Sequence, residues 1–189
     1  MTQPSPARRE TLDAHSASGN VPPGRVVVEG LDDPRDLEGL FAHRHRSEVR
    51  FADTDAMGHV NNAVYLTYVE AARVAWWRDV TGEPIQREPE RSQGLILAEA
   101  EVAYRAPVFH GDTITVETRP TRIGRSSLTM EHRLTARAGD EAARLVATSR
   151  CVVVRYDYTT ERPVPFPGEL VAAIETAAGK RLRAESSRP

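Results

Sequence analysis

Two carboxylates and a histidine lie close together in one short glycine-containing segment of the chain, residues 53–62. Asp53 and Asp55 are two residues apart, and we expect only one of them, Asp55, to face a cleft. A carboxylate in a cleft can act as a nucleophile or as a general base that activates water. A histidine exchanges protons near neutral pH, so His59 could orient a water molecule. The alternative for His59 is a structural bond to the backbone of a tight turn.

A long helix is predicted directly after this segment. Asn61 or Asn62 can cap it by accepting a hydrogen bond from a free backbone N–H. We expect the helix to run to about Val80, where Gly82 and Pro84 end it. Its apolar side chains cover about half of the circumference, which is wider than a surface helix requires. A helix of this kind needs a sheet wrapped around it.

Alternation of apolar and polar residues predicts strands on both sides of this helix. Residues 45–51 suit a strand before it. Gly124 and the pair Gly139-Asp140 predict turns between later strands, which implies antiparallel hairpins. Together these elements predict an α+β fold, with a curved antiparallel sheet around one long central helix. The strands expected after the helix are residues 94–104, 113–123, 127–136 and 143–156.

One face of the third of these later strands is predicted to be buried. It carries Leu128, Met130, His132 and Leu134 at alternating positions. The single cysteine, Cys151, lies in an apolar run, so we interpret it as a small buried hydrophobic residue. A single cysteine also excludes an intrachain disulfide.

The structured domain is expected to span residues 43–158, with extensions on both sides. Residues 1–42 are interpreted as a largely disordered N-terminal extension, because their first half is rich in Pro, Ser, Ala and Arg. Residues 159–189 form a C-terminal extension with a short helix expected at about 168–183. A chain of 189 residues fits one domain.

The composition excludes several classes of protein. A net charge of −2 and a pI of 6.3 give no general attraction to nucleic acid or to an anionic membrane. No apolar run approaches the roughly 20 residues of a membrane span. The N-terminus lacks the apolar core of a secretory signal, so a cytoplasmic location is expected. No metal is expected, because no cysteine or carboxylate completes a set with His43, His45 and His59.

The segment from Arg50 to Leu66, continuing to Glu70 and Arg73, resembles the signature of the 4-hydroxybenzoyl-CoA thioesterase family. Its specific part is D-x-D-x-x-G-x-x-x-N, which ends at Asn62. The resemblance covers roughly residues 44–156. It implies the hotdog fold, in which an antiparallel sheet wraps a long central helix, and an acyl-CoA thioesterase that needs no cofactor.

The same resemblance implies the roles of several residues. Asp55 matches the catalytic carboxylate, which acts on the thioester as nucleophile or as general base. The backbone at the start of the helix, around Gly58, Val60 and Asn61, matches the amides that polarise the thioester carbonyl. Glu70 is the alternative acid, because a second hotdog family takes its glutamate from the helix.

His59, Asn61 and Asn62 resemble the corresponding turn of a branch that contains acyl-carrier-protein thioesterases, in which polar residues around the histidine assist catalysis. That branch has an asparagine two residues before the histidine, where this chain has Met57. The alternative role for Asn61 and Asn62 is helix capping.

The coenzyme is expected at a hairpin. A basic residue in the corresponding turn of the family contacts the CoA nucleotide, and it matches Arg125, with Ser126 beside it. The alternative is an ordinary solvated arginine.

The resemblance also implies a homodimer or a dimer of dimers, with the active site at the subunit interface. The substrate is acyl-CoA or an acyl-carrier-protein thioester. The alternatives to hydrolysis are a non-hydrolytic protein that binds acyl thioesters, a hydratase-like hotdog protein, or a structural protein without catalysis.

Overall fold

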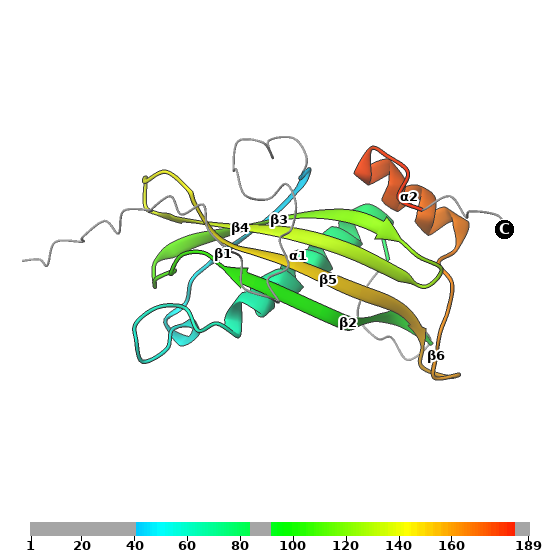
Figure 1. The fold of residues 1–189 in the computed structure, drawn as a ribbon, viewed down its shortest axis with the longest axis horizontal. Coiled ribbons are helices and arrows are strands. Elements are labelled where there is room, and N and C mark those ends of the chain that lie inside the picture. The colour runs from blue at the N-terminus through cyan, green and yellow to red at the C-terminus, as the bar shows by residue number, and fades with distance from the viewer. Residues whose placement is uncertain (1–40, 84–91, 184–189) are drawn as a thin grey trace, which may run out of the picture.

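An antiparallel sheet curves around one long helix in the computed structural model, which describes residues 41–83 and 92–183 (Figure 1). The helix, α1, spans Val64–Thr81. The strands are β1 (His43–Glu48), β2 (Gln93–Tyr104), β3 (Asp112–Ile123), β4 (Ser127–Ala138), β5 (Arg144–Asp157) and the short β6 (Arg162–Pro163). A single 3-10 turn, η1 (Phe51–Asp53), follows β1, and a second helix, α2 (Gly168–Ala178), lies near the C-terminus. This arrangement is the hotdog fold, as predicted.

The strand order in the sheet is β1-β3-β4-β5-β2, with β6 paired to the end of β5. The predicted hairpins at Gly124 and at Gly139-Asp140 are confirmed, since β3 pairs with β4 and β4 with β5. β2 does not pair with its neighbour in sequence, β3, and joins the far side of β5 instead. β5, which carries the apolar run from Val152 to Tyr156, is therefore inside the sheet, and β1 and β2 form its edges.

The chain turns earlier before α1 than expected. A strand was predicted over residues 45–51, whereas β1 ends at Glu48 and the chain then enters η1. The reason is local, because the Asp53 carboxylate accepts a hydrogen bond from the backbone N–H of Arg50 at 2.9 Å. That bond fixes a turn where alternation alone predicted an extended chain.

The start of α1 differs from the prediction and its end agrees with it. Neither Asn61 nor Asn62 is the capping residue; Ala63 is, and no side chain caps the helix. The Asn61 side chain closes the preceding turn, where its Oδ1 accepts a hydrogen bond from the Ala63 N–H at 2.9 Å. Gly82 ends the helix with a φ of 68°, in the left-handed region that favours glycine. Pro84 lies outside the described residues.

The inner face of the sheet is buried against α1, as expected for Leu128, Met130, His132 and Leu134, which are at most 1% exposed. Burial lowers the pKa of His132 to about 3, so this core histidine stays neutral. Cys151, on β5, is fully buried beside it, which confirms its interpretation as a core residue. The sheet does not enclose the whole helix, since the helix residues Leu66 and Val74 remain more than one third exposed.

α2 covers the part of the sheet that lies beyond the C-terminal end of α1 (Figure 1). It is shorter than the predicted 168–183, because Gly179 ends it in a left-handed conformation with a φ of 65°. Ile174 of α2 packs in one cluster with Trp76 and Trp77 of α1. No helix among the described residues is long and apolar enough to cross a membrane. Residues 1–40 of the predicted N-terminal extension lie outside the described residues, whereas its Phe41 is buried.

Candidate active site

The turn that carries Asp55 is a small closed loop held by backbone bonds. Thr54 and Val60 form an isolated antiparallel bridge at its base. Inside it, the Asp55 N–H donates to the His59 carbonyl at 2.9 Å, and the Gly58 N–H donates to the Asp55 carbonyl at 3.0 Å. Gly58 has a φ of 81°, which an L-residue adopts only with strain. The loop is therefore a defined platform for its side chains.

The two carboxylates that the sequence singled out have different environments. Asp53 is 2% exposed, whereas the Asp55 side chain is 20% exposed. One Asp55 oxygen, Oδ1, accepts a hydrogen bond from the Met57 N–H at 2.9 Å. The other, Oδ2, lies 3.6 Å from Nδ1 of His59, whose side chain is 35% exposed. Asp55 and His59 thus form a solvent-accessible pair of a carboxylate and an imidazole, and Asp53 does not take part in it.

Some backbone N–H groups near this pair already donate hydrogen bonds within the protein, and others have no acceptor among the described residues. The N–H groups of Val60 and Asn61 donate to the carbonyls of Val108 and Asp53 at 2.8 and 2.9 Å. The Gly58 N–H is engaged within the loop. No group in the described part of the chain accepts a hydrogen bond from the N–H of His59 or Asn62. These two amides, together with that of Ala56, which also has no acceptor among the described residues, are therefore donors near Asp55 that a ligand could use.

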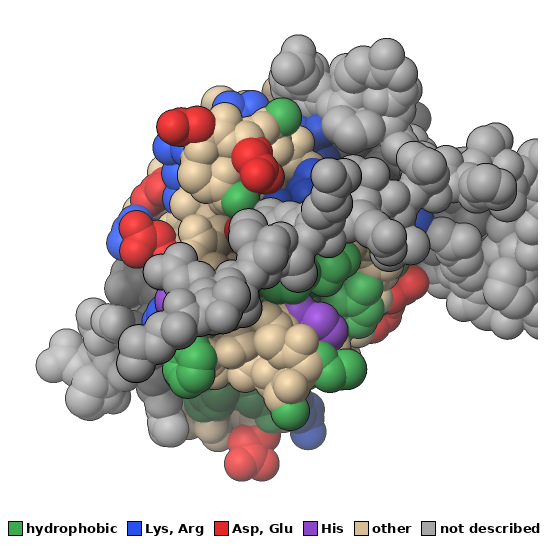
Figure 2. All heavy atoms as spheres, turned by 90° about the vertical axis from the view of Figure 1, so that its left-hand side faces the viewer, with side chains coloured by type: hydrophobic (Ala, Val, Ile, Leu, Met, Phe, Trp, Pro, Cys, Tyr) green, Lys and Arg blue, Asp and Glu red, His purple; other side chains and the backbone are tan. Residues whose placement is uncertain are grey.

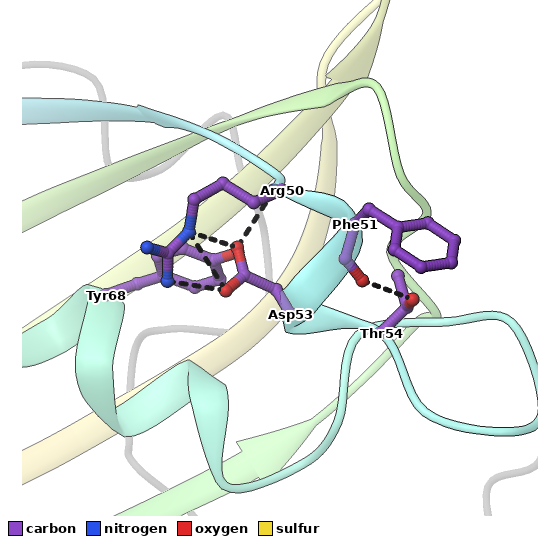
Figure 3. Close-up of polar contacts among 5 residues, drawn as sticks. All are labelled: Arg50, Phe51, Asp53, Thr54 and Tyr68. Atoms are coloured by element: carbon purple, nitrogen blue, oxygen red, sulfur yellow. Dashed lines mark hydrogen bonds and ion pairs between the residues drawn. The ribbon is translucent and has the colours of Figure 1, made fainter.

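A polar network around the buried carboxylate of Asp53 lies beside the loop, and the Arg50 side chain in it is 72% exposed (Figure 3). The guanidinium of Arg50 donates to both oxygens of Asp53, with the shortest contact 2.7 Å from the terminal nitrogen to Oδ1. The hydroxyl of Tyr68, in the second turn of α1, donates to Oδ2 of Asp53 at 2.8 Å. Hydrogen bonds from Arg50 hold the pKa of Asp53 at about 2. Sequence reasoning did not identify Arg50 and Tyr68 as partners of this carboxylate.

The end of the molecule that carries the Asp55 loop has an apolar surface. Figure 2 views this end and shows hydrophobic side chains gathered around a histidine. Phe51 and Met57 are 79% and 76% exposed, and Phe109, which is bridged to His59, is 41% exposed. Apolar side chains this exposed beside polar groups are typical of a binding surface.

A groove of about 240 Å³ runs along the uncovered side of α1. Its charged residues are Glu70 and Arg73, which are spaced i,i+3 and contact each other at 3.9 Å. The other walls come from α1, β2 and β5, and the groove is therefore bounded by the edge strand β2. Its apolar residues include Leu66, Val69, Val74, Leu95, Leu97, Ala100 and Val153.

Arg125 and Ser126 are far from Asp55 within one chain. β3 begins at Asp112, beside the Asp55 loop, and ends at Ile123, beside the hairpin. Its 12 residues separate the two places by roughly 36 Å at about 3.3 Å per residue. The backbone carbonyls of Arg125 and Ser126 accept bonds from Phe166 and Arg155, while the Arg125 side chain is exposed. The predicted catalytic and coenzyme residues therefore do not meet in one subunit.

A metal site does not emerge from the described residues, which contain no group of three His, Cys, Asp or Glu residues placed to hold an ion. Of the histidines considered for this role, His43 contacts Asp79 at 3.1 Å near the C-terminal end of α1. His59 is at the other end of the helix.

Comparison with known proteins relates this geometry to a family. A thioesterase from Thermus thermophilus, whose structure contains coenzyme A and Zn, superimposes with a TM-score of 0.63 at 34% identity. The match covers 76% of this chain and 99% of that chain. The 1,4-dihydroxy-2-naphthoyl-CoA hydrolase of Thermosynechococcus vestitus is 27% identical over 140 residues, which cover 72% of this chain and 93% of the relative.

A third relative, the long-chain acyl-CoA thioesterase FadM of Escherichia coli, is 24% identical over 128 residues, or 68% of this chain and 93% of its own. The pattern of one family matches residues 49–174, which include the Asp55 loop, α1, strands β2 to β6 and most of α2. This match covers more than half of the chain. The chain belongs to the thioesterase-like superfamily.

Proposed function

We propose that this protein hydrolyses acyl-CoA thioesters to a free acid and CoA, with Asp55 as its catalytic carboxylate. The observation that carries the proposal is the accessible Asp55–His59 pair, which lies in a loop with available amides directly before α1. Relatives named as thioesterases or CoA hydrolases support the reaction class. They act on substrates as different as an aromatic and a long-chain acyl-CoA, so the acyl group stays open.

The reaction requires a new bond to the thioester carbonyl and loss of the thiolate. As a general base, Asp55 takes a proton from water while the water oxygen attacks the carbonyl carbon. As a nucleophile, it forms an anhydride that water then cleaves. In both routes the C–S bond breaks and the sulfur leaves as CoA thiol after taking up a proton. His59, 3.6 Å from Asp55, orients the carboxylate or the water.

Negative charge develops on the carbonyl oxygen in both routes, and it needs preorganised donors. The amides of His59 and Asn62 fit this role, since they have no acceptor among the described residues, and Asn62 directly precedes the N-cap Ala63 of α1, where the helix dipole is positive. Gly58, Val60 and Asn61 contribute by shaping the loop around the substrate, because their own amides are already engaged.

Binding of the whole coenzyme needs a second subunit in this proposal. Arg125 and Ser126 cannot reach a thioester at Asp55 of their own chain, so we assign them to the CoA nucleotide bound at the active site of the partner. Edge strand β2 supports this assembly, since its Leu97 is 48% exposed and lies beside the open groove along α1. A homodimer, alone or in a dimer of dimers, is the expected state.

The test is release of free thiol from short, long, branched and aryl acyl-CoAs by the purified full-length chain. Asp55→Asn should abolish release, while Asp140→Asn, a charge change in the exposed β4–β5 turn, should not. Wild-type turnover by Asp55→Asn would refute the assignment of Asp55. Tight acyl-CoA binding with no thiol release would favour a non-hydrolytic protein, and conversion of an enoyl thioester to its hydroxy form would favour a hydratase.

A further inference from the structure

We propose that Asp53 is a positioning residue, which Arg50 and Tyr68 hold so that the Asp55 loop keeps a fixed place on α1. This inference rests on the proposed function, since it concerns how Asp55 is placed. Asp53 does not touch the substrate in this view. It sets the distance between the Asp55 carboxylate and the amides that face the carbonyl oxygen.

The side chain of Asp53 connects the loop to the helix. Its Oδ2 accepts the Tyr68 hydroxyl at 2.8 Å, and Tyr68 is itself 5% exposed and fixed in the core. The same carboxylate accepts the backbone N–H of Arg50 at 2.9 Å, in addition to the Arg50 guanidinium. One carboxylate thus joins the end of β1, η1 and the second turn of α1 (Figure 3).

The backbone of Asp53 connects the two sides of the loop. Its carbonyl accepts the Asn61 N–H at 2.9 Å, directly after the loop and before the helix. The next residue, Thr54, bridges to Val60 and donates its hydroxyl to the Phe51 carbonyl at 2.7 Å. Asp55 directly follows Thr54, and Asn62 directly follows Asn61. Both Thr54 and Asn61 are therefore fixed by the bonds described above.

Charge makes this anchor specific. A buried carboxylate is costly without a partner, and Asp53 is 2% exposed with the Arg50 guanidinium against it. Ionised Asp53 accepts bonds from three different donors at once, whereas an amide oxygen in its place forms weaker bonds and adds an N–H that repels the donors. The opposite charge of Arg50 also limits the field of Asp53 at the nearby Asp55.

The experiment compares steady-state kinetics of wild type, Asp53→Asn and Tyr68→Phe on the best acyl-CoA substrate. We expect Asp53→Asn to lower kcat on the order of tenfold to a hundredfold while KM changes less than about threefold. Tyr68→Phe removes one hydroxyl and keeps the ring, so it should fold normally and lower kcat by about threefold to tenfold. The double variant should be no slower than Asp53→Asn, because both changes break the same contact.

Asp157→Asn is the matched control. Asp157 is also a buried carboxylate, 9% exposed, and it accepts backbone N–H groups of Thr159 and Thr160. It lies at the far end of β5, beside Gln93. This variant should lower the melting temperature and leave kcat unchanged. If Asp157→Asn and Asp53→Asn lower kcat equally, the effect is general destabilisation and the positioning role is wrong.

The outcome separates this inference from the proposed function. If Asp55→Asn abolishes thiol release and Asp53→Asn has the wild-type kcat, the positioning role fails and the assignment of Asp55 stands. If Asp55→Asn retains full turnover, the proposed catalytic group fails first. A fall in kcat for both Asp53→Asn and Tyr68→Phe, with KM held, supports the positioning role.

Discussion

Both ends of α1 pack in apolar clusters, and the N-terminal end adds a polar anchor on a buried carboxylate. At its N-terminal end, Tyr68 donates to the buried carboxylate of Asp53, which also binds Arg50. At its C-terminal end, Trp76 and Trp77 pack against α2 and the strands in an apolar cluster. Hydrogen bonds to a charged group fix direction and distance, whereas apolar burial supplies free energy and tolerates small shifts. The end that needs precise geometry has the polar anchor.

The largest expected effect separates the two aspartates. Asp55→Asn should lower kcat on the order of 10³-fold or more and leave the free energy of unfolding nearly unchanged, since Asp55 is partly exposed. Asp53→Asn should lower kcat less and reduce the free energy of unfolding by about 1–3 kcal/mol, because it weakens hydrogen bonds to a buried charge. Thiol-release kinetics and urea denaturation of both variants check this. If Asp55→Asn has the lower free energy of unfolding of the two variants, the distinction between a catalytic Asp55 and a structural Asp53 is wrong.

The apolar end should show the reverse behaviour. Ile174 of α2 is fully buried, so Ile174→Ala should reduce the free energy of unfolding by about 2–5 kcal/mol. Activity per folded molecule should stay within about twofold of wild type, measured at a temperature where both proteins are folded. Thr176→Ala, at an exposed position of α2, is the control and should change stability by less than about 0.5 kcal/mol. Loss of kcat in Ile174→Ala would mean that α2 also shapes the site.

The stability that Asp53 contributes at the N-terminal end of α1 should depend on pH. The pKa of Asp53 is lowered to about 2, below the value of about 3.9 for an unfolded aspartate. The stabilisation is therefore present above about pH 4 and is lost as the pH falls through about 2. The difference in unfolding free energy between wild type and Asp53→Asn should shrink between about pH 5 and pH 2. A difference that stays constant across this range would mean that the charge of Asp53 contributes nothing.

Sequence patterns predicted the elements that depend on neighbouring residues, and they missed the contacts between segments that are distant in the sequence. The Asp55 turn, the long helix and both glycine hairpins follow from residue type and spacing within a few positions. The pairing of β2 with β5 does not, because the sheet chooses partners by packing over long separations. The bond from Tyr68 to Asp53 spans 15 residues and two elements, so no periodicity could indicate it. Asn61 was correctly placed near a helix start, but its oxygen closes the preceding turn.

The smallest expected effect compares two glycines at the opposite ends of α1. Gly58, in the Asp55 loop, and Gly82, at the end of the helix, have φ values of 81° and 68°, and an added Cβ would meet nothing within 4 Å at either position. Alanine should therefore cost about 1–2 kcal/mol of stability at both, from backbone strain alone. The matched strain has different consequences for catalysis, because only Gly58 lies between Asp55 and His59. Gly58→Ala should lower kcat several-fold and Gly82→Ala should not, when kinetics and thermal melts are measured side by side. Equal losses of kcat would show that strain at either end of α1 reaches the site, and that the polar anchor does not isolate the Asp55 loop from the rest of the helix.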